Sequence, residues 1–154
     1  MRELTPDEQA KLKRQAERLE QFLAELMPVL ADFAERLGLP NAVMIVANPE
    51  SFLEPTDDFM KDQVIETEDR EWIMARLGYF IGEVLVQRFG GGWFLSDTPY
   101  SRFFLRYVVG KFEGGVNRRA MIDPFLVADT YLAEPPGRSL PSFLKEVEAE
   151  VMKA

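Results

Sequence analysis

The stretch that decides the fold is residues 70–95, REWIMARLGYFIGEVLVQRFGGGWFL. Its apolar residues cover more than one face of a helix, which predicts a central helix, from about Thr67 to Phe89, that is buried on several sides. The glycine run at 90–92 supplies the positive-φ freedom that a helix stop and a sharp turn require. We therefore expect the helix to end there and a strand to begin at Trp93.

Two glycines and one acid interrupt the apolar surface of this central helix. Gly78 and Gly82 each cost about 1 kcal/mol of helix propensity relative to alanine, so we expect another element to approach closely there. Glu83 lies in the most apolar part of the chain, and burying a carboxylate alone is costly. Three interpretations are open: an ion pair with an arginine, an exposed acid, or an acid that faces a ligand. The candidate ion-pair partners are Arg102, Arg106, Arg118 and Arg119.

Residues 1–38 are expected to form a long N-terminal helical segment. Thr5, Pro6 and Glu8 have the residue types of an N-cap, a first helical position and a capping box. Apolar residues then recur in alternating steps of four and three, which is a heptad seam. The seam consists of Leu12, Ala16, Leu19, Leu23, Leu26, Leu30, Phe33 and Leu37. Pro28 predicts a kinked helix or two abutting helices. We expect the seam to lie on the protein's own core; the alternative is a homodimer through this helix.

Residues 41–69 form an acidic connector. The apolar run at 42–47 fits a buried strand or one helical turn, and periodicity does not decide between them. Residues 41–71 contain nine acidic and two basic residues, whereas residues 88–119 contain six basic and two acidic ones. These charges either neutralise each other within the fold or form a basic sheet face that receives an acidic partner.

Three strands and two helices are expected after the glycine run. Residues 93–96, 102–109 and 116–122 predict an antiparallel meander, and two C-terminal helices follow from Pro124 and from about Ser139. We therefore predict a single α+β domain over residues 1–154. In it, the long N-terminal helix and the central buried helix pack on a small antiparallel sheet of three to four strands, and the two C-terminal helices complete the cover.

The composition narrows the possible classes of function. The 154 residues have a net charge of −8, which argues against nucleic acid and anionic membranes as partners. Because the sequence has no His and no Cys, it lacks the usual general base, the thiolate nucleophile and the commonest metal ligands. We expect no enzymatic activity and no cofactor. There is no apolar signal region, and no apolar run reaches membrane-spanning length, so a cytoplasmic protein is expected.

Two groups of residues are candidate sites. The first would line a ligand pocket between the central helix and the sheet, and it comprises Glu83, Trp93, Arg106 and Arg118. The second is acidic and offers oxygen ligands to a hard cation such as Mg²⁺. It comprises Asp57, Asp58 and Asp62. Acidic surface turns are common, so we interpret these three as solvated acids and predict no metal site.

The strings LGYFIGEVL at 77–85, GGW at 91–93, DPF at 123–125 and SL at 139–140 resemble a group of small uncharacterised bacterial proteins, a domain of unknown function. The group shares an LGxxxGE helix, a GxW turn, a later proline–phenylalanine pair and a closing amphipathic helix. The resemblance covers roughly residues 70–147 and implies no function.

The functional expectation is therefore a non-enzymatic protein that binds another protein, as an inhibitor, an adaptor or an immunity-like protein. The alternative is a small-ligand-binding domain that uses the first group of site residues.

Overall fold

A computed structural model describes residues 3–114, 117 and 119–153. Its helices are α1 (Pro6–Arg36), α2 (Leu53–Met60), α3 (Thr67–Phe89), α4 (Pro124–Ala133) and α5 (Leu140–Met152). Its strands are β1 (Gly92–Leu95), β2 (Tyr107–Gly110) and β3 (Met121–Ile122). Two short 3₁₀ helices, Ala42–Ile45 and Pro49–Phe52, precede α2. The predicted α+β class is confirmed, including the long N-terminal helix, the three-stranded antiparallel sheet and the two C-terminal helices.

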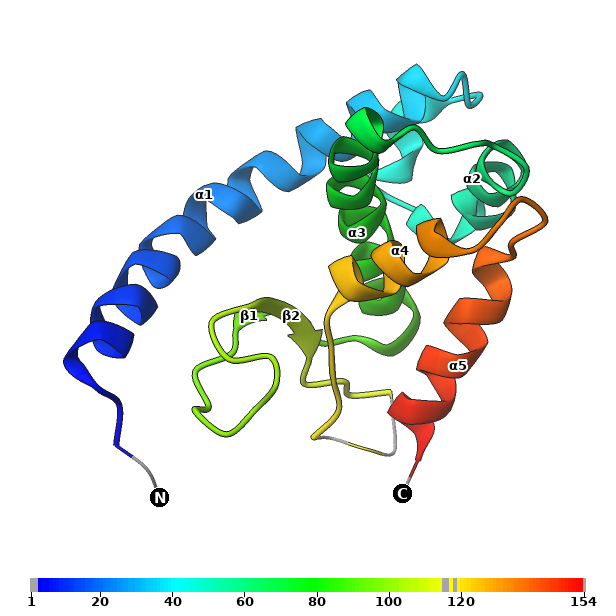
Figure 1. Ribbon diagram of the computed structural model, residues 1–154. Helices are drawn as coiled ribbons and strands as arrows, with labels where there is room; N and C mark the ends of the chain where they lie inside the picture. The colour runs from blue at the N-terminus through cyan, green and yellow to red at the C-terminus, as the bar shows by residue number, and fades with distance from the viewer. Residues whose placement is uncertain (1–2, 115–116, 118, 154) are drawn as a thin grey trace.

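Helix α3 is the centre of the molecule, and α4 packs across it (Figure 1). Its residues Leu77, Phe80, Ile81, Val84 and Leu85 are fully buried, so α3 is covered on several sides as predicted. The close approach expected at its two glycines is also confirmed, because a Cβ on either one would overlap an aromatic ring of another element. The ring at Gly78 belongs to Phe125 of α4, and the ring at Gly82 belongs to Trp93 of β1.

Helix α1 begins with the predicted capping box, in which Thr5 Oγ1 accepts from the Glu8 N–H and Glu8 Oε1 accepts from the Thr5 N–H. Pro28 lies inside one continuous helix, so the alternative of two abutting helices is wrong. Only the second half of the helix reaches the core, where Leu26, Leu30 and Phe33 are buried. The first half extends away from the helical body toward the N-terminus (Figure 1).

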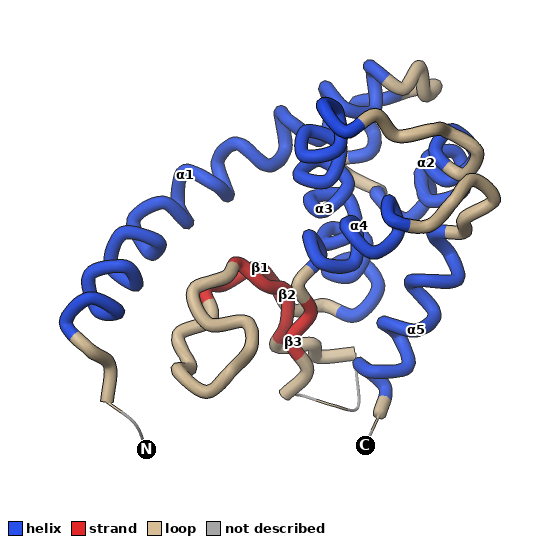
Figure 2. The backbone as a smooth tube through the Cα atoms, viewed as in Figure 1, coloured by secondary structure: helices blue, strands red, loops and turns tan. Residues whose placement is uncertain are grey.

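The sheet is an antiparallel meander, β1–β2–β3, that pairs Trp93 with Val109 and Val109 with Ile122 (Figure 2). Two predicted strand lengths are wrong. The strand expected at 102–109 begins only at Tyr107, because the chain before it forms a closed loop. The strand expected at 116–122 consists of Met121 and Ile122, and residues 115, 116 and 118 lie outside the described residues.

Backbone hydrogen bonds between Ser96 and the 105–106 segment close this loop. The Ser96 N–H donates to the Arg106 oxygen and the Leu105 N–H donates to the Ser96 oxygen, each at 2.9 Å. Leu105 has φ +69°, a left-handed conformation outside the region of regular strands. The residues Phe103 and Leu105, whose alternation predicts a strand, therefore lie in a compact loop.

The acidic connector folds into short helices along the core. Residues 42–45 form a 3₁₀ helix, which decides between the strand and the helical turn left open by the sequence. Ile45 is fully buried, whereas Val43 is 70% exposed. The buried residues form one hydrophobic cluster that runs from Leu26 in α1 to Val151 in α5. Among the described residues, no helix combines the length and the apolar character needed to cross a bilayer.

Candidate functional site

Trp93, a predicted ligand-binding residue, is a packing residue. Its ring lies in an aromatic cluster with Phe22, Tyr79 and Phe125, at centroid distances of 5.1, 6.5 and 5.9 Å. The ring also covers the Gly82 backbone, where a Cβ would come within 2.9 Å of Trp93 Cε2. In the described part of the chain, Trp93 lines neither the cavity that contains Arg106 nor three other cavities.

Glu83 is half-buried on α3, next to the glycine that Trp93 covers. Within the described residues, its carboxylate makes no ion pair and no hydrogen bond. Burial raises the pKa of this carboxyl group. Two of the arginines proposed as partners are engaged elsewhere: Arg106 with Asp123, and Arg102 over the Phe103 ring. Arg118, the fourth predicted site residue, lies outside the described residues.

The raised pKa of Glu83 predicts a pH-dependent stability. Between the ordinary pKa of the unfolded carboxyl and the raised pKa in the fold, the folded protein binds more protons, so stability falls as the pH rises through that window. Above it, the cost of the buried charge is fully present. Glu83→Gln should therefore raise the melting temperature at pH 7. The gain should shrink below about pH 4, where the glutamate is protonated in both states. Thermal unfolding across a pH series measures this, and an equal gain at every pH would contradict it.

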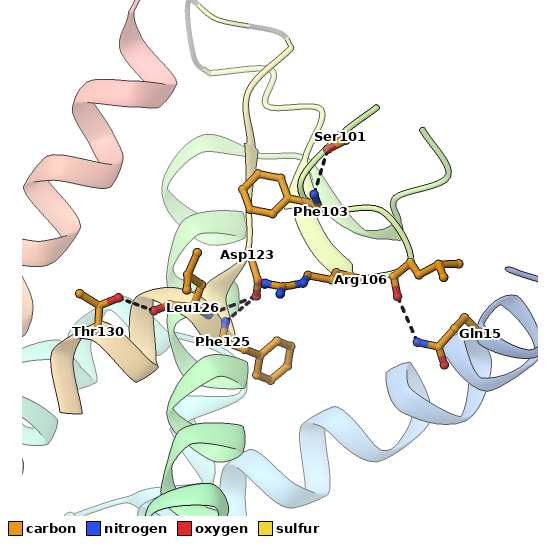
Figure 3. A network of polar contacts seen from close by, with 9 residues as sticks. Gln15, Ser101, Phe103, Arg106, Asp123, Phe125, Leu126 and Thr130 are labelled. Carbon is orange, nitrogen blue, oxygen red and sulfur yellow. Dashed lines mark hydrogen bonds and ion pairs between the residues drawn. The ribbon is translucent and has the colours of Figure 1, made fainter. Parts of the chain in front are cut away.

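Arg106 lies in a different place, at a buried acid that caps α4 (Figure 3). Asp123 Oδ1 accepts from the N–H groups of Phe125 and Leu126, and its Oδ2 accepts from Arg106 Nη1 at 2.9 Å. The Asp123 side chain is 4% exposed and that of Arg106 is 52% exposed. The pair joins the residue before β2 to the N-cap of α4 and leaves much of the guanidinium open to solvent. Sequence reasoning missed Asp123, although an Asp immediately before Pro124 is a typical N-cap signal.

A cavity of about 400 Å³ lies beside this pair. Apolar walls come from Met74, Leu105, Phe125 and Leu126, and the charged side chains on it are Arg106, Asp123 and Asp129. Arg70 neutralises Asp129 at 2.8 Å. A second hollow, of about 500 Å³, shares Asp123 and Leu126 with the first. The structure thus brings Arg106 to a cavity, but does not bring Glu83 or Trp93 to it.

The acidic trio of the connector is divided between core and surface. Asp57 is 9% exposed, and its Oδ1 accepts from the Tyr131 hydroxyl and from the Leu140 N–H, both at 2.8 Å. Asp58 instead pairs with Lys61 on the surface at 3.2 Å. Asp57 is therefore a structural acid, which corrects our interpretation of it as a solvated one. In the described part of the chain, no cluster of three or more acidic side chains could hold a metal ion.

The remaining candidate site is the first half of the α1 seam. We call Leu12, Ala16, Leu19 and Leu23 the open seam, because the core covers none of them: Ala16 and Leu23 are exposed, and Leu12 and Leu19 are half-buried. The expectation that the seam lies on the protein's own core thus holds only from Leu26 onward.

The neighbouring side of this half-helix is tied to the body. Gln15 Nε2 donates to the Leu105 oxygen at 3.1 Å, and the Tyr107 hydroxyl donates to the Gln15 oxygen at 2.7 Å. Phe22 enters the aromatic cluster, 4.8 Å from the Tyr107 ring. These contacts hold the half-helix in a fixed orientation, in which Ala16 and Leu23 of the open seam are exposed and Leu12 and Leu19 are half-buried.

Comparison of the chain with models of protein families, with curated protein sequences and with solved structures gave no match.

Proposed function

We propose that this protein works by binding another protein, and that the open seam of α1 is the contact surface. The observation that carries the proposal is the incomplete burial of a regular heptad seam. Leu23 is 42% exposed and Met27, beside the seam, is 40% exposed, although the same helix buries Leu26 and Leu30 almost completely. Apolar residues at this spacing on one helix face are the usual means by which a helix binds a groove or another helix.

The attachment of α1 supports this proposal. The capping box fixes the start of the helix, and the bonds from Gln15 and Tyr107 hold its first half against the loop that precedes β2. A preformed, oriented helix loses little conformational entropy when a partner binds. The apolar side chains of the open seam would leave water on binding, which gives the association its driving force.

The test uses Leu23→Glu, which puts a charge in the middle of the open seam. Its matched control is Ala10→Glu, which adds the same charge at an exposed position of the same helix, away from the seam. Tagged chains are used to capture proteins from the source cell, followed by mass spectrometry. We expect recovery of the partner to fall at least about tenfold with Leu23→Glu, because a charge desolvated in an apolar contact costs more than 1.4 kcal/mol, and to be unchanged with Ala10→Glu. Equal recovery by both variants would contradict the proposal.

The Arg106 cavity favours a second candidate function, the binding of a small apolar carboxylate. Its volume, about 400 Å³, lies in the range of small-molecule sites. Asp123 fixes one edge of the guanidinium, and an arginine held in this way is suited to a carboxylate on its free edge. If the cavity binds such a carboxylate, benzoate should raise the melting temperature of the protein. Benzyl alcohol, which has the same ring but no carboxylate, should not.

A further inference from the structure

We propose that the open seam binds a second copy of this chain, with the two α1 helices antiparallel. This inference rests on the proposed function and names its partner. The pairing has a two-fold axis between Glu17 and Arg18. It places Leu12 against Leu23 of the second copy and Ala16 against Leu19 of the second copy, so that the open seam is complementary to itself.

The spacing of the open seam is the first argument. Its steps of four, three and four are those of a two-helix seam. Under the two-fold operation, Leu12 and Leu23 form layers of two large side chains. Ala16 and Leu19 form layers of one small and one large side chain. The small Ala16 lies next to the axis, where the two helices approach most closely. The next seam residue, Leu26, is buried in the protein's own core, so the pairing ends where the chain itself begins to cover the seam.

The charges beside the open seam are the second argument. Lys13 follows Leu12 and Glu20 follows Leu19, both are exposed, and neither has an ion pair among the residues that the structure describes. In the antiparallel arrangement, Lys13 lies beside Glu20 of the second copy, and the symmetry repeats this attractive pair. The opposite flank is occupied by Gln15 and Phe22, which contact the chain's own body. The second copy therefore approaches from the side of Lys13 and Glu20.

The net charge of the chain favours the antiparallel orientation. In a parallel pair, each residue of the open seam meets its own equivalent, and Lys13 faces the flank that carries Glu8. A parallel pair would put the bodies of two chains, each chain with a net charge of −8, next to each other. The antiparallel pair moves the two bodies to opposite ends of the shared helices.

Cysteine cross-linking tests this register, and the chain suits it because the sequence has no Cys. Leu12→Cys and Leu23→Cys chains are made separately, mixed, and oxidised in a glutathione buffer. In the antiparallel pair, Cys at position 12 faces Cys at position 23 of the other variant. Two equivalent positions lie about 16 Å apart along the helix axis, from eleven residues at 1.5 Å each, whereas a disulfide needs Cα atoms within about 7 Å.

We expect the mixture to give a disulfide dimer of one chain of each variant, and several-fold less dimer from either variant alone. A mixture of Ala10→Cys with Leu23→Cys is the control for random collision. Dimer from Leu12→Cys alone would show a parallel pair, and equal yields in all mixtures would show collision only; both results would overturn the proposal. The absence of cross-links, together with a captured protein of another kind that is lost with Leu23→Glu, would overturn the second copy as partner and leave the proposed function intact.

Discussion

Asp57→Ala is expected to lower the free energy of unfolding by about 3–5 kcal/mol, because two hydrogen bonds to a buried carboxylate are lost and their donors stay buried. The Asp57 oxygen holds both the Tyr131 hydroxyl and the first N–H of α5, that of Leu140. Tyr131 is fully buried, and burial, with the hydrogen bond to Asp57, raises the pKa of its phenol far above the usual range. The neutral hydroxyl therefore remains a donor, without an acceptor, in the variant.

Arg138 packs on the same tyrosine that Asp57 holds. Its guanidinium is buried, donates to the backbone oxygens of Met60, Gln63 and Glu134, and lies over the Tyr131 ring. Tyr131 therefore contacts both the Asp57 carboxylate and the Arg138 guanidinium, and Asp57→Ala removes the first of these contacts.

Urea unfolding measures the loss, and Asp58→Ala is the matched control. Asp58 is the next residue and also an aspartate, but it makes only a surface ion pair with Lys61. Its replacement should change stability by no more than about 0.5 kcal/mol. If the two variants were equally stable, Asp57 would have no structural role.

Gly82→Ala is expected to destabilise the protein by about 1–3 kcal/mol, although alanine is the better helix former by about 1 kcal/mol. The new methyl group would overlap the six-membered ring of Trp93. That ring has little freedom to move, because Phe22, Tyr79 and Phe125 surround it.

Trp93→Phe provides the control for this second prediction. Phenylalanine lacks the far part of the indole that overlaps the added Cβ. In the Trp93→Phe background, Gly82→Ala should therefore cost much less, or become stabilising. The double-mutant cycle, measured by urea unfolding, should give a coupling free energy of at least about 1 kcal/mol. Strict additivity would mean that the Trp93 ring does not determine the need for glycine.

Local patterns in the sequence predict the helices well. The capping box at Thr5, the apolar surface of α3 and the prolines at the starts of α4 and α5 each depend on residues within one or two turns. The two glycines of α3 could be predicted to mark a close approach, because they carry a helix cost that only packing explains. The identity of the rings that cover these glycines could not be predicted, because Phe125 and Trp93 belong to other elements.

The errors arise where contacts distant in sequence decide the structure. The alternation from Arg102 to Val109 predicts a strand, but bonds between Ser96 and the 105–106 segment fold its first half into a loop. Asp57 has the pattern of a surface acid, and only its contacts with Tyr131 and Leu140, more than seventy residues away, make it a core residue. The sequence leaves three environments open for Glu83, and the structure leaves its side chain half-buried without an ion pair among the described residues.

The N-terminal helix depends both on a local sequence pattern and on contacts distant in sequence. Its heptad seam is visible in the sequence, but the sequence does not show that the core covers only the part from Leu26 onward. The open seam is the surface on which the functional proposal depends.

Sedimentation equilibrium over a concentration series up to about 1 mM, the scale of a weak association of −4.1 kcal/mol, most directly tests the claim that the open seam binds a second copy of the chain. For the unmodified chain, the weight-average mass should rise from 17.7 kDa toward twice that value. Leu23→Glu should remain at 17.7 kDa at every concentration, and Ala10→Glu should behave like the unmodified chain. A constant mass of 17.7 kDa for the unmodified chain, or association that Leu23→Glu leaves unchanged, would contradict self-association through the open seam.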